Sequence, residues 1–110
     1  MRKLALTNES KQAVVERIGC EPAFARALLD EAATLFLNGD PQAARLILRD
    51  LVNATLGFEG LALETARPSK SLHRMLSSRG NPSMENLAAI FDVLRRGMRV
   101  ELQARTVKAA

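Results

Sequence analysis

The side chains best suited to binding chemistry in this 110-residue chain gather between Thr65 and Met84. This stretch contains no carboxylate and four cations: Arg67, Lys70, Arg74 and Arg79. Cations gathered in this way suit a phosphate backbone, because a protein that neutralises phosphates releases their counterions. Charge runs are usually solvated faces, so the pattern gains meaning only from the helix that carries it.

The net charge of the chain, +4, lies entirely in the half that holds this stretch. Residues 1–56 contain seven basic and seven acidic side chains, whereas residues 57–110 contain nine basic and five acidic ones. An excess confined to one half is the electrostatic footprint expected of a nucleic-acid partner.

The basic stretch is predicted to form a helix over residues 69–77. Leu72, Met75 and Leu76 recur at three- and four-residue spacing and therefore share one face, which we assign to the core. The opposite face carries polar side chains: Lys70, Ser71, Arg74 and Ser78. The outward face of this helix is thus the candidate binding surface.

Short breaks bound the helix on both sides. Ala66-Arg67-Pro68 ends a preceding helical pattern that opens at Leu61, since the residue before proline disfavours helical geometry. Gly80-Asn81-Pro82 ends the basic helix, and Ser83 then caps a longer one. That longer helix has an apolar stripe: Leu87, Ile90, Phe91 and Leu94. Two helices joined by a turn of about three residues present a recognition helix to the major groove of DNA.

Roles within this motif follow from position. The residues at the start and outer face of the helix are predicted to reach base edges: Ser69, Lys70, Ser71 and Arg74. Arg74 is the strongest base-reading candidate, with a solvated arginine or an ion pair with Glu64 as the alternative. Residues near turns and helix starts are predicted to hold phosphates: Arg67, His73, Arg79, Asn81 and Ser83. For Asn81 and Ser83, pure turn and cap chemistry is an equally good interpretation.

Four segments together resemble a known group: Asn38-Gly39-Asp40-Pro41, Leu61 to Thr65, Ser71 to Leu76, and Gly80-Asn81-Pro82-Ser83. Over residues 22–103 the chain is similar to helix-turn-helix regulators of the addiction-module antidote (antitoxin-like) group, related to phage-repressor-type DNA-binding domains. The resemblance implies operator DNA bound through the second helix of the motif, usually by a dimer, and in some members a toxin partner. Two positions depart from the pattern. Ala66 replaces the usual turn glycine and is expected to avoid the left-handed conformation, and Arg67 replaces an apolar plug and is expected to point at DNA.

The remaining chain reads as scaffold within one domain over residues 1–110. Three further helices are predicted, the first from a Thr7 cap to Gly19, the second from Pro22 to Asn38-Gly39, and the third from Asp40-Pro41 to Leu56. We divide the chain into an amino-terminal arm or helix (1–20), a helix-turn-helix core (21–103) and a flexible tail (104–110).

The segment 98–103 alternates apolar with charged residues and predicts a short β-strand after Gly97. Because it has no partner strand within the chain, we expect it to pair with the same strand of a second subunit. The predicted fold is therefore an all-α helical bundle with a helix-turn-helix and one carboxyl-terminal strand.

Catalysis is not expected. Tyrosine is absent, and His73, the only histidine, has no carboxylate in helical register to orient it. No cofactor loop, metal cluster, signal peptide or membrane helix is evident, so we expect a cytoplasmic protein without cofactor, metal or membrane partner. Cys20 reads as a small residue at a helix junction. The alternative function is a protein-interaction module, docking a toxin, that does not bind DNA.

Overall fold

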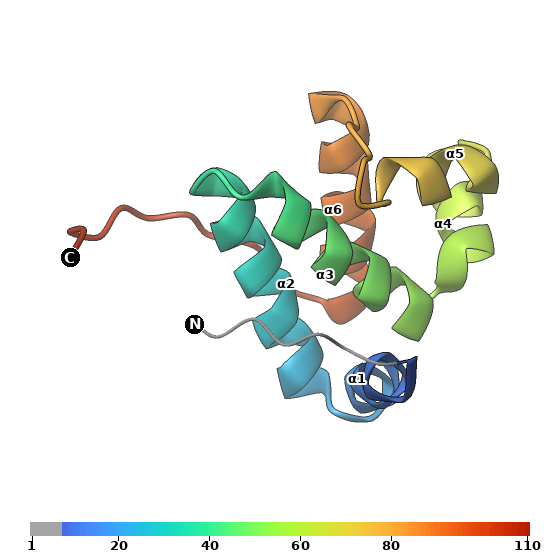
Figure 1. The fold of residues 1–110 in the computed structure, drawn as a ribbon, viewed down its shortest axis with the longest axis horizontal. Helices are drawn as coiled ribbons and strands as arrows, with labels where there is room; N and C mark the ends of the chain where they lie inside the picture. The colour runs from blue at the N-terminus through green and yellow to red at the C-terminus, as the bar shows by residue number, and fades with distance from the viewer. Residues whose placement is uncertain (1–7) are drawn as a thin grey trace.

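The computed structural model describes residues 8–110, and in that range the chain forms six α-helices (Figure 1). In chain order they are α1 (Asn8–Cys20), α2 (Pro22–Leu37), α3 (Pro41–Ala54), α4 (Gly57–Thr65), α5 (Ser69–Met75) and α6 (Met84–Met98). The predicted all-α class is confirmed for these residues, which contain no strand. The Thr7 cap predicted for the first helix lies outside the described residues.

Helix starts follow local cap chemistry. Pro22 and Pro41 occupy the first turns of α2 and α3, where a missing N–H costs nothing. The Asp40 carboxylate accepts a hydrogen bond from the Ala43 N–H at 3.2 Å, and Gly39 makes the preceding turn at a φ of 91°. Both junctions lie where the sequence predicts them, because the signals that set them are local.

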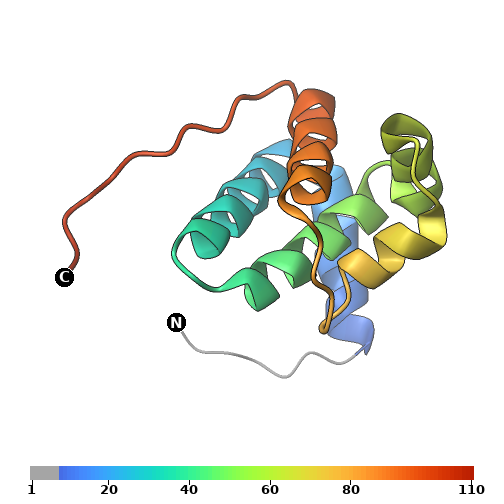
Figure 2. The same ribbon diagram turned by 90° about the horizontal axis from the view of Figure 1, so that it is seen from above.

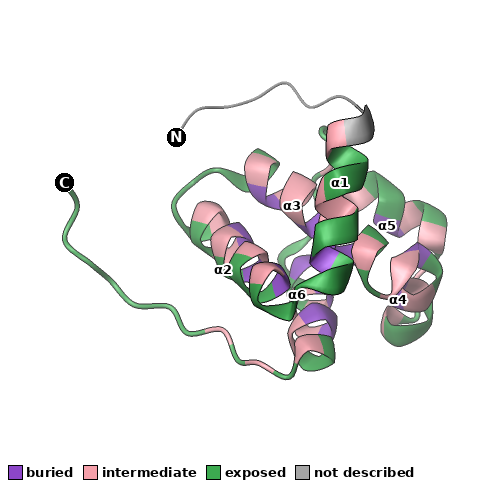
Figure 3. Cartoon of the chain, turned by 90° about the horizontal axis from the view of Figure 1, so that it is seen from below, coloured by how far each residue is buried: buried purple, intermediate pink, exposed green. Residues whose placement is uncertain are grey.

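The core forms where all six helices of the described range turn their apolar faces toward one another, α5 through Leu72 (Figure 3). The pair α2 and α3 makes the most extensive interhelical packing, and α1 joins it through the buried Ile18. Side chains with no exposed surface fill the centre: Leu29, Leu48, Leu51, Leu61, Leu72, Leu76, Ile90 and Val52. Each such burial contributes about 1.5–3 kcal/mol to stability. The core assignments made for the basic helix and the longer helix after it are thus confirmed: Leu72, Leu76, Leu87, Ile90 and Leu94 are buried, and Met75 and Phe91 are half-buried against the core.

The carboxyl-terminal strand prediction is wrong for the chain as it stands. α6 continues through Gly97 to Met98, and Arg99 ends it in the left-handed conformation at a φ of 59°. The Val100 N–H donates to the Arg95 carbonyl at 3.0 Å and closes the cap. Beyond it, Val100 and Leu102 pack against the core while their neighbours are exposed. The alternation in the sequence therefore reports one-sided burial of an extended segment that has no partner strand.

The expectation for Ala66 is also wrong, because this residue adopts the left-handed conformation with φ 54° and ψ 38°. The N–H groups of Ala66 and Arg67 both donate to the Ala62 carbonyl and close the end of α4. Those hydrogen bonds and the buried helices on either side of the turn hold alanine in a conformation that glycine adopts without cost.

Ala66→Gly is expected to stabilise the protein by about 0.5–1 kcal/mol. The left-handed conformation costs an L-residue about 1–2 kcal/mol, from which the extra chain entropy of an unfolded glycine, about 0.4–1 kcal/mol, must be subtracted. The matched control is Ala88→Gly at an exposed position inside α6, which should lose about 1 kcal/mol. Urea denaturation of both variants measures the difference. Equal destabilisation of both would contradict the strained turn.

Leu72→Ala is expected to cost about 2–5 kcal/mol, since it opens a cavity under α5 where the side chain has no exposed surface. Leu63→Ala on α4 is the control, because Leu63 is 85% exposed and should change stability by less than about 0.5 kcal/mol. Thermal melts with far-ultraviolet circular dichroism compare the two. Similar losses of stability in both variants would show that the inward face of α5 is assigned wrongly.

Candidate nucleic-acid interface

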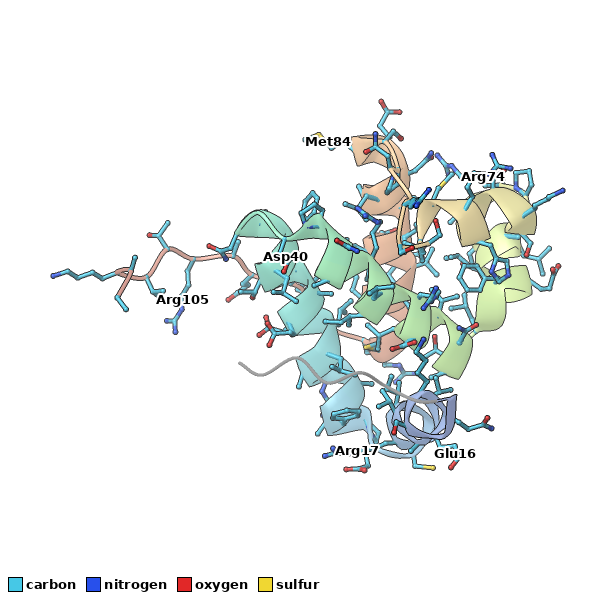
Figure 4. All side chains as sticks on the ribbon, in the orientation of Figure 1. Glu16, Arg17, Asp40, Arg74, Met84 and Arg105 are labelled. Atoms are coloured by element: carbon cyan, nitrogen blue, oxygen red, sulfur yellow. The ribbon has the colours of Figure 1, made fainter. Side chains whose placement is uncertain are left out.

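The outward face of α5 carries the two cations predicted to lie there. Leu72 and Leu76 have no exposed surface and fix the inward face of the helix. Lys70 and Arg74 are both exposed and lie four residues apart, which aligns them along the opposite ridge. Figure 4 shows Arg74 at the outer edge of the molecule. Ser69 and Ser71 are half-buried beside this ridge.

α5 is positioned by α4, the neighbour with which it makes its main contacts. The rings of Phe58 and His73 stack with their centroids 3.8 Å apart and their planes 18° from parallel. Phe58 is buried at the start of α4, so this stack ties the last turn of α5 to the beginning of the helix before it. His73 is therefore engaged through one ring face, and its predicted phosphate contact would use the exposed remainder.

Arg67 lies in the three-residue turn between α4 and α5 and folds back onto the helix that it follows. Its Nη1 donates to the Thr65 carbonyl at 2.9 Å, and its side chain is half-buried. A guanidinium keeps further N–H donors after one such bond. Its remaining donors make no hydrogen bond with any described residue, and the expectation that Arg67 points at DNA stays a prediction.

Apart from Arg67, the cations of the carboxyl-terminal half fall into two sets. On α6, Arg95 and Arg96 bind Asp92 at 2.7 and 2.9 Å. The hydrogen bond from Arg96 lowers the pKa of the Asp92 carboxyl below its usual value, with further lowering by both arginine charges. The second set makes no ion pair or side-chain hydrogen bond with any residue in the range 8–110: Lys70, Arg74, Arg79, Arg99, Arg105 and Lys108.

The ion pair considered between Arg74 and Glu64 is absent from the described structure. Glu64 lies instead 3.9 Å from Arg96 Nη1, both side chains being about half exposed. Arg74 is therefore a solvated cation in the free protein, and its charge is available to a ligand.

Arg45 holds the segment after α5, a role that the sequence pattern does not reveal. From α3, its Nε donates to the Ser77 carbonyl at 3.2 Å and its Nη2 donates to the Ser78 carbonyl at 3.1 Å. The only local signal is its place beside Ala44, at the edge of the apolar stripe of α3. Its partners lie more than 30 residues further along the chain, so only the fold brings them together.

Gly80 allows the chain to pass close to the end of α5. Its N–H donates to the Ser77 carbonyl at 3.0 Å. A Cβ at this position would lie 2.6 Å from the Arg74 carbonyl oxygen and nearer still to that of Met75, both of them backbone atoms. Glycine is required here by close backbone approach.

The start of α6 lies beside this loop. The Ser83 Oγ accepts a hydrogen bond from the Asn86 N–H at 3.1 Å, so the cap role considered for Ser83 is confirmed. Asn81 is exposed. Met84, 83% exposed, lies on the same edge of the molecule as Arg74 (Figure 4), and sequence reasoning did not select it. Glu85 is the first carboxylate beyond the cationic stretch and is exposed in the first turn of α6.

Other kinds of site are not evident in the described residues. Within residues 8–110 there is no group of three or more histidine, cysteine or acidic side chains able to hold a metal ion. Cys20 is a free, exposed thiol at the end of α1. None of the described helices combines the length and the apolar character needed to cross a membrane. Comparisons of the chain with protein-family models, curated proteins and solved structures find no match.

Gly80→Ala is expected to destabilise the protein by about 1–3 kcal/mol and to loosen the end of α5, because backbone atoms must move to admit the methyl group. Gly97→Ala is the matched control: its added Cβ would meet no atom within 4 Å inside α6, and it should stabilise by up to about 1 kcal/mol. Chemical denaturation gives the energies, and amide hydrogen exchange locates the loosening. Unchanged protection of α5 in Gly80→Ala would refute the steric argument.

Proposed function

We propose that this protein is a sequence-specific DNA-binding transcriptional regulator, a dimeric repressor that reads the major groove through α5. In this proposal α4, the turn 66–68 and α5 form a helix-turn-helix, with α5 as the recognition helix. One observation carries the proposal: α5 is anchored by fully buried leucines and presents Lys70 and Arg74 outward without a carboxylate partner among the described side chains.

The two exposed cations suit different tasks. A planar guanidinium donates two hydrogen bonds to O6 and N7 of guanine, so Arg74 is the proposed base reader. Lys70 lies one turn nearer the start of the helix, where side chains of recognition helices reach base edges. Ser69 and Ser71 flank it and supply hydroxyl groups that serve either base edges or phosphates.

Phosphate contacts are proposed for residues around the two turns. Arg79 and Asn81 are exposed in the loop that follows α5, and His73 and Arg67 border the helix on the side of α4. The Ser83 hydroxyl already accepts the hydrogen bond that caps α6, so Ser83 would contribute to phosphate binding by orienting the start of that helix. These contacts would position the protein on DNA without specifying sequence.

The resemblance to antidote regulators supports the same function and adds a partner. Proteins of that group bind operator DNA, and some bind a toxin encoded beside them. The exposed Leu63 on α4, 85% accessible, supports the alternative of a protein-docking module. Mixing the protein with the product of the neighbouring reading frame tests toxin binding separately from DNA binding.

Arg74→Ala is expected to lose about 1–3 kcal/mol of discrimination at one base pair. Fluorescence anisotropy on the upstream DNA of the gene and on scrambled DNA, across about 50–200 mM salt, measures it. Arg26→Ala removes the same charge from an exposed position on α2 and should leave sequence preference unchanged. Arg74→Lys should keep the salt dependence and lose the preference, because ammonium cannot form the bidentate contact.

Three outcomes would count against the proposal in different ways. An equal loss on all sequences in Arg74→Ala would make that residue a phosphate contact. Equal effects of Arg26→Ala and Arg74→Ala would remove α5 as the recognition helix. Absence of DNA binding under all of these conditions would favour the docking module.

A further inference from the structure

The carboxyl-terminal segment, residues 99–110, leaves the end of α6 and runs in an extended course past α2 and beyond the helical body (Figures 1 and 2). Its start is anchored, since Val100 and Leu102 pack against the core. From Glu101 onward its backbone forms no hydrogen bond with any residue in the range 8–110. Both edges of the segment therefore present N–H and C=O groups that no described residue uses, as an exposed edge strand does.

A groove runs between this segment and α2. It has a volume of about 810 Å³ and is lined on the α2 side by Ala33, Thr34 and Leu37. The other wall is formed by residues 102–107 of the segment itself. Leu37 and Val107 are 63% and 75% exposed, so apolar surface lies uncovered on both walls. This combination of free backbone edge and apolar wall suits an added strand, whose side chains cover one face while its backbone pairs with the other.

The charges of the segment identify the strand that fits. Glu101 and Arg105 lie two residues before and two residues after Gln103. When two copies of the segment run antiparallel and are centred on Gln103, each Glu101 lies opposite Arg105 of the partner subunit. Cross-strand pairs of opposite charge are favourable, and the two-fold symmetry forms this pair twice. A parallel, in-register arrangement would instead oppose like charges at both positions.

We propose that the occupant of this groove is a second copy of the chain, joined through antiparallel pairing of the carboxyl-terminal segments about Gln103. The two segments form a two-stranded ribbon across the dimer axis and cover Leu37 of each subunit. The strand of the dimer then begins at Glu101, beyond the cap that closes α6, and not at residue 98. This inference deepens the proposed function, on which its biological meaning rests, since it names the dimer partner and register of the DNA reader.

Disulfide trapping tests the register. In a Cys20→Ser background, Gln103→Cys introduces one cysteine per subunit, and the proposed register places the two directly opposite each other. Their Cα atoms would lie about 4.5–5.5 Å apart, a distance that a disulfide can span. Mild oxidation should convert this variant almost fully to a covalent dimer. Lys108→Cys in the same background is the control, because the proposed register separates its two copies by about 33 Å. Equal cross-linking of both variants, or none in Gln103→Cys, would overturn the proposal.

Charge reversal tests the same pairing without a covalent bond. Glu101→Arg opposes two arginines at each end of the ribbon and should raise the dimer dissociation constant about ten-fold in sedimentation equilibrium. The double variant Glu101→Arg with Arg105→Glu exchanges the charges and should restore the original dissociation constant. A monomeric parent protein, or a double variant as weak as the single one, would refute the inference. Both tests omit DNA. The dimer proposal can therefore fail while DNA binding by α5 holds, and DNA binding can fail while the dimer proposal holds.

Discussion

Every part of the candidate interface depends on the anchoring of α5, because a helix of seven residues is too short to be stable alone. Leu72 and Leu76 bury its inner face completely. The Phe58–His73 stack ties it to α4, and Arg45 fixes the chain that follows it. A binding surface on this helix would thus rest directly on the core, to which α2, α3 and α6 contribute most of the buried side chains.

The arginines of α6 are paired with carboxylates, whereas the cations of α5 remain free to bind a ligand. Asp92 binds both Arg95 and Arg96, and Glu64 lies near Arg96, so the charge of α6 is balanced locally. These exposed pairs contribute little to stability. α5, by contrast, carries Lys70 and Arg74 and no carboxylate, so its positive charge is unbalanced, and the candidate surface depends on the carboxylates beside α6 as well as on the cations of α5.

The sequence predicts features whose cause is local. The Asp40-Pro41 start of α3, the Ser83 cap of α6 and the inward spacing of Leu72 and Leu76 are all found where local rules place them. The exposed ridge of the candidate site follows from the same spacing.

Features with a tertiary cause are mispredicted or missed. Arg45 acts on carbonyls distant in sequence, and Ala66 is held left-handed by hydrogen bonds and by the helices on either side. The alternation after Gly97 is real, but a strand also needs a partner, which residues 8–110 of one chain do not supply. The local sequence pattern predicts which face of a segment is buried. It does not predict what packs against that face, because the packing partner is set by the tertiary fold or by another molecule.

The position of the carboxyl-terminal segment reconciles dimerisation with DNA binding. The segment passes beside α2, whereas α4 and α5 lie at the opposite end of the body in both views (Figures 1 and 2). A dimer joined through the segment leaves Lys70 and Arg74 of both subunits uncovered, so the two interactions do not compete for surface. Because a two-fold dimer reads two half-sites a fixed number of helical turns apart, the length of the ribbon sets the spacing that an operator must have. In the proposed dimer, the extended segment would therefore fix the distance between the two α5 helices, and α5 would contact the DNA.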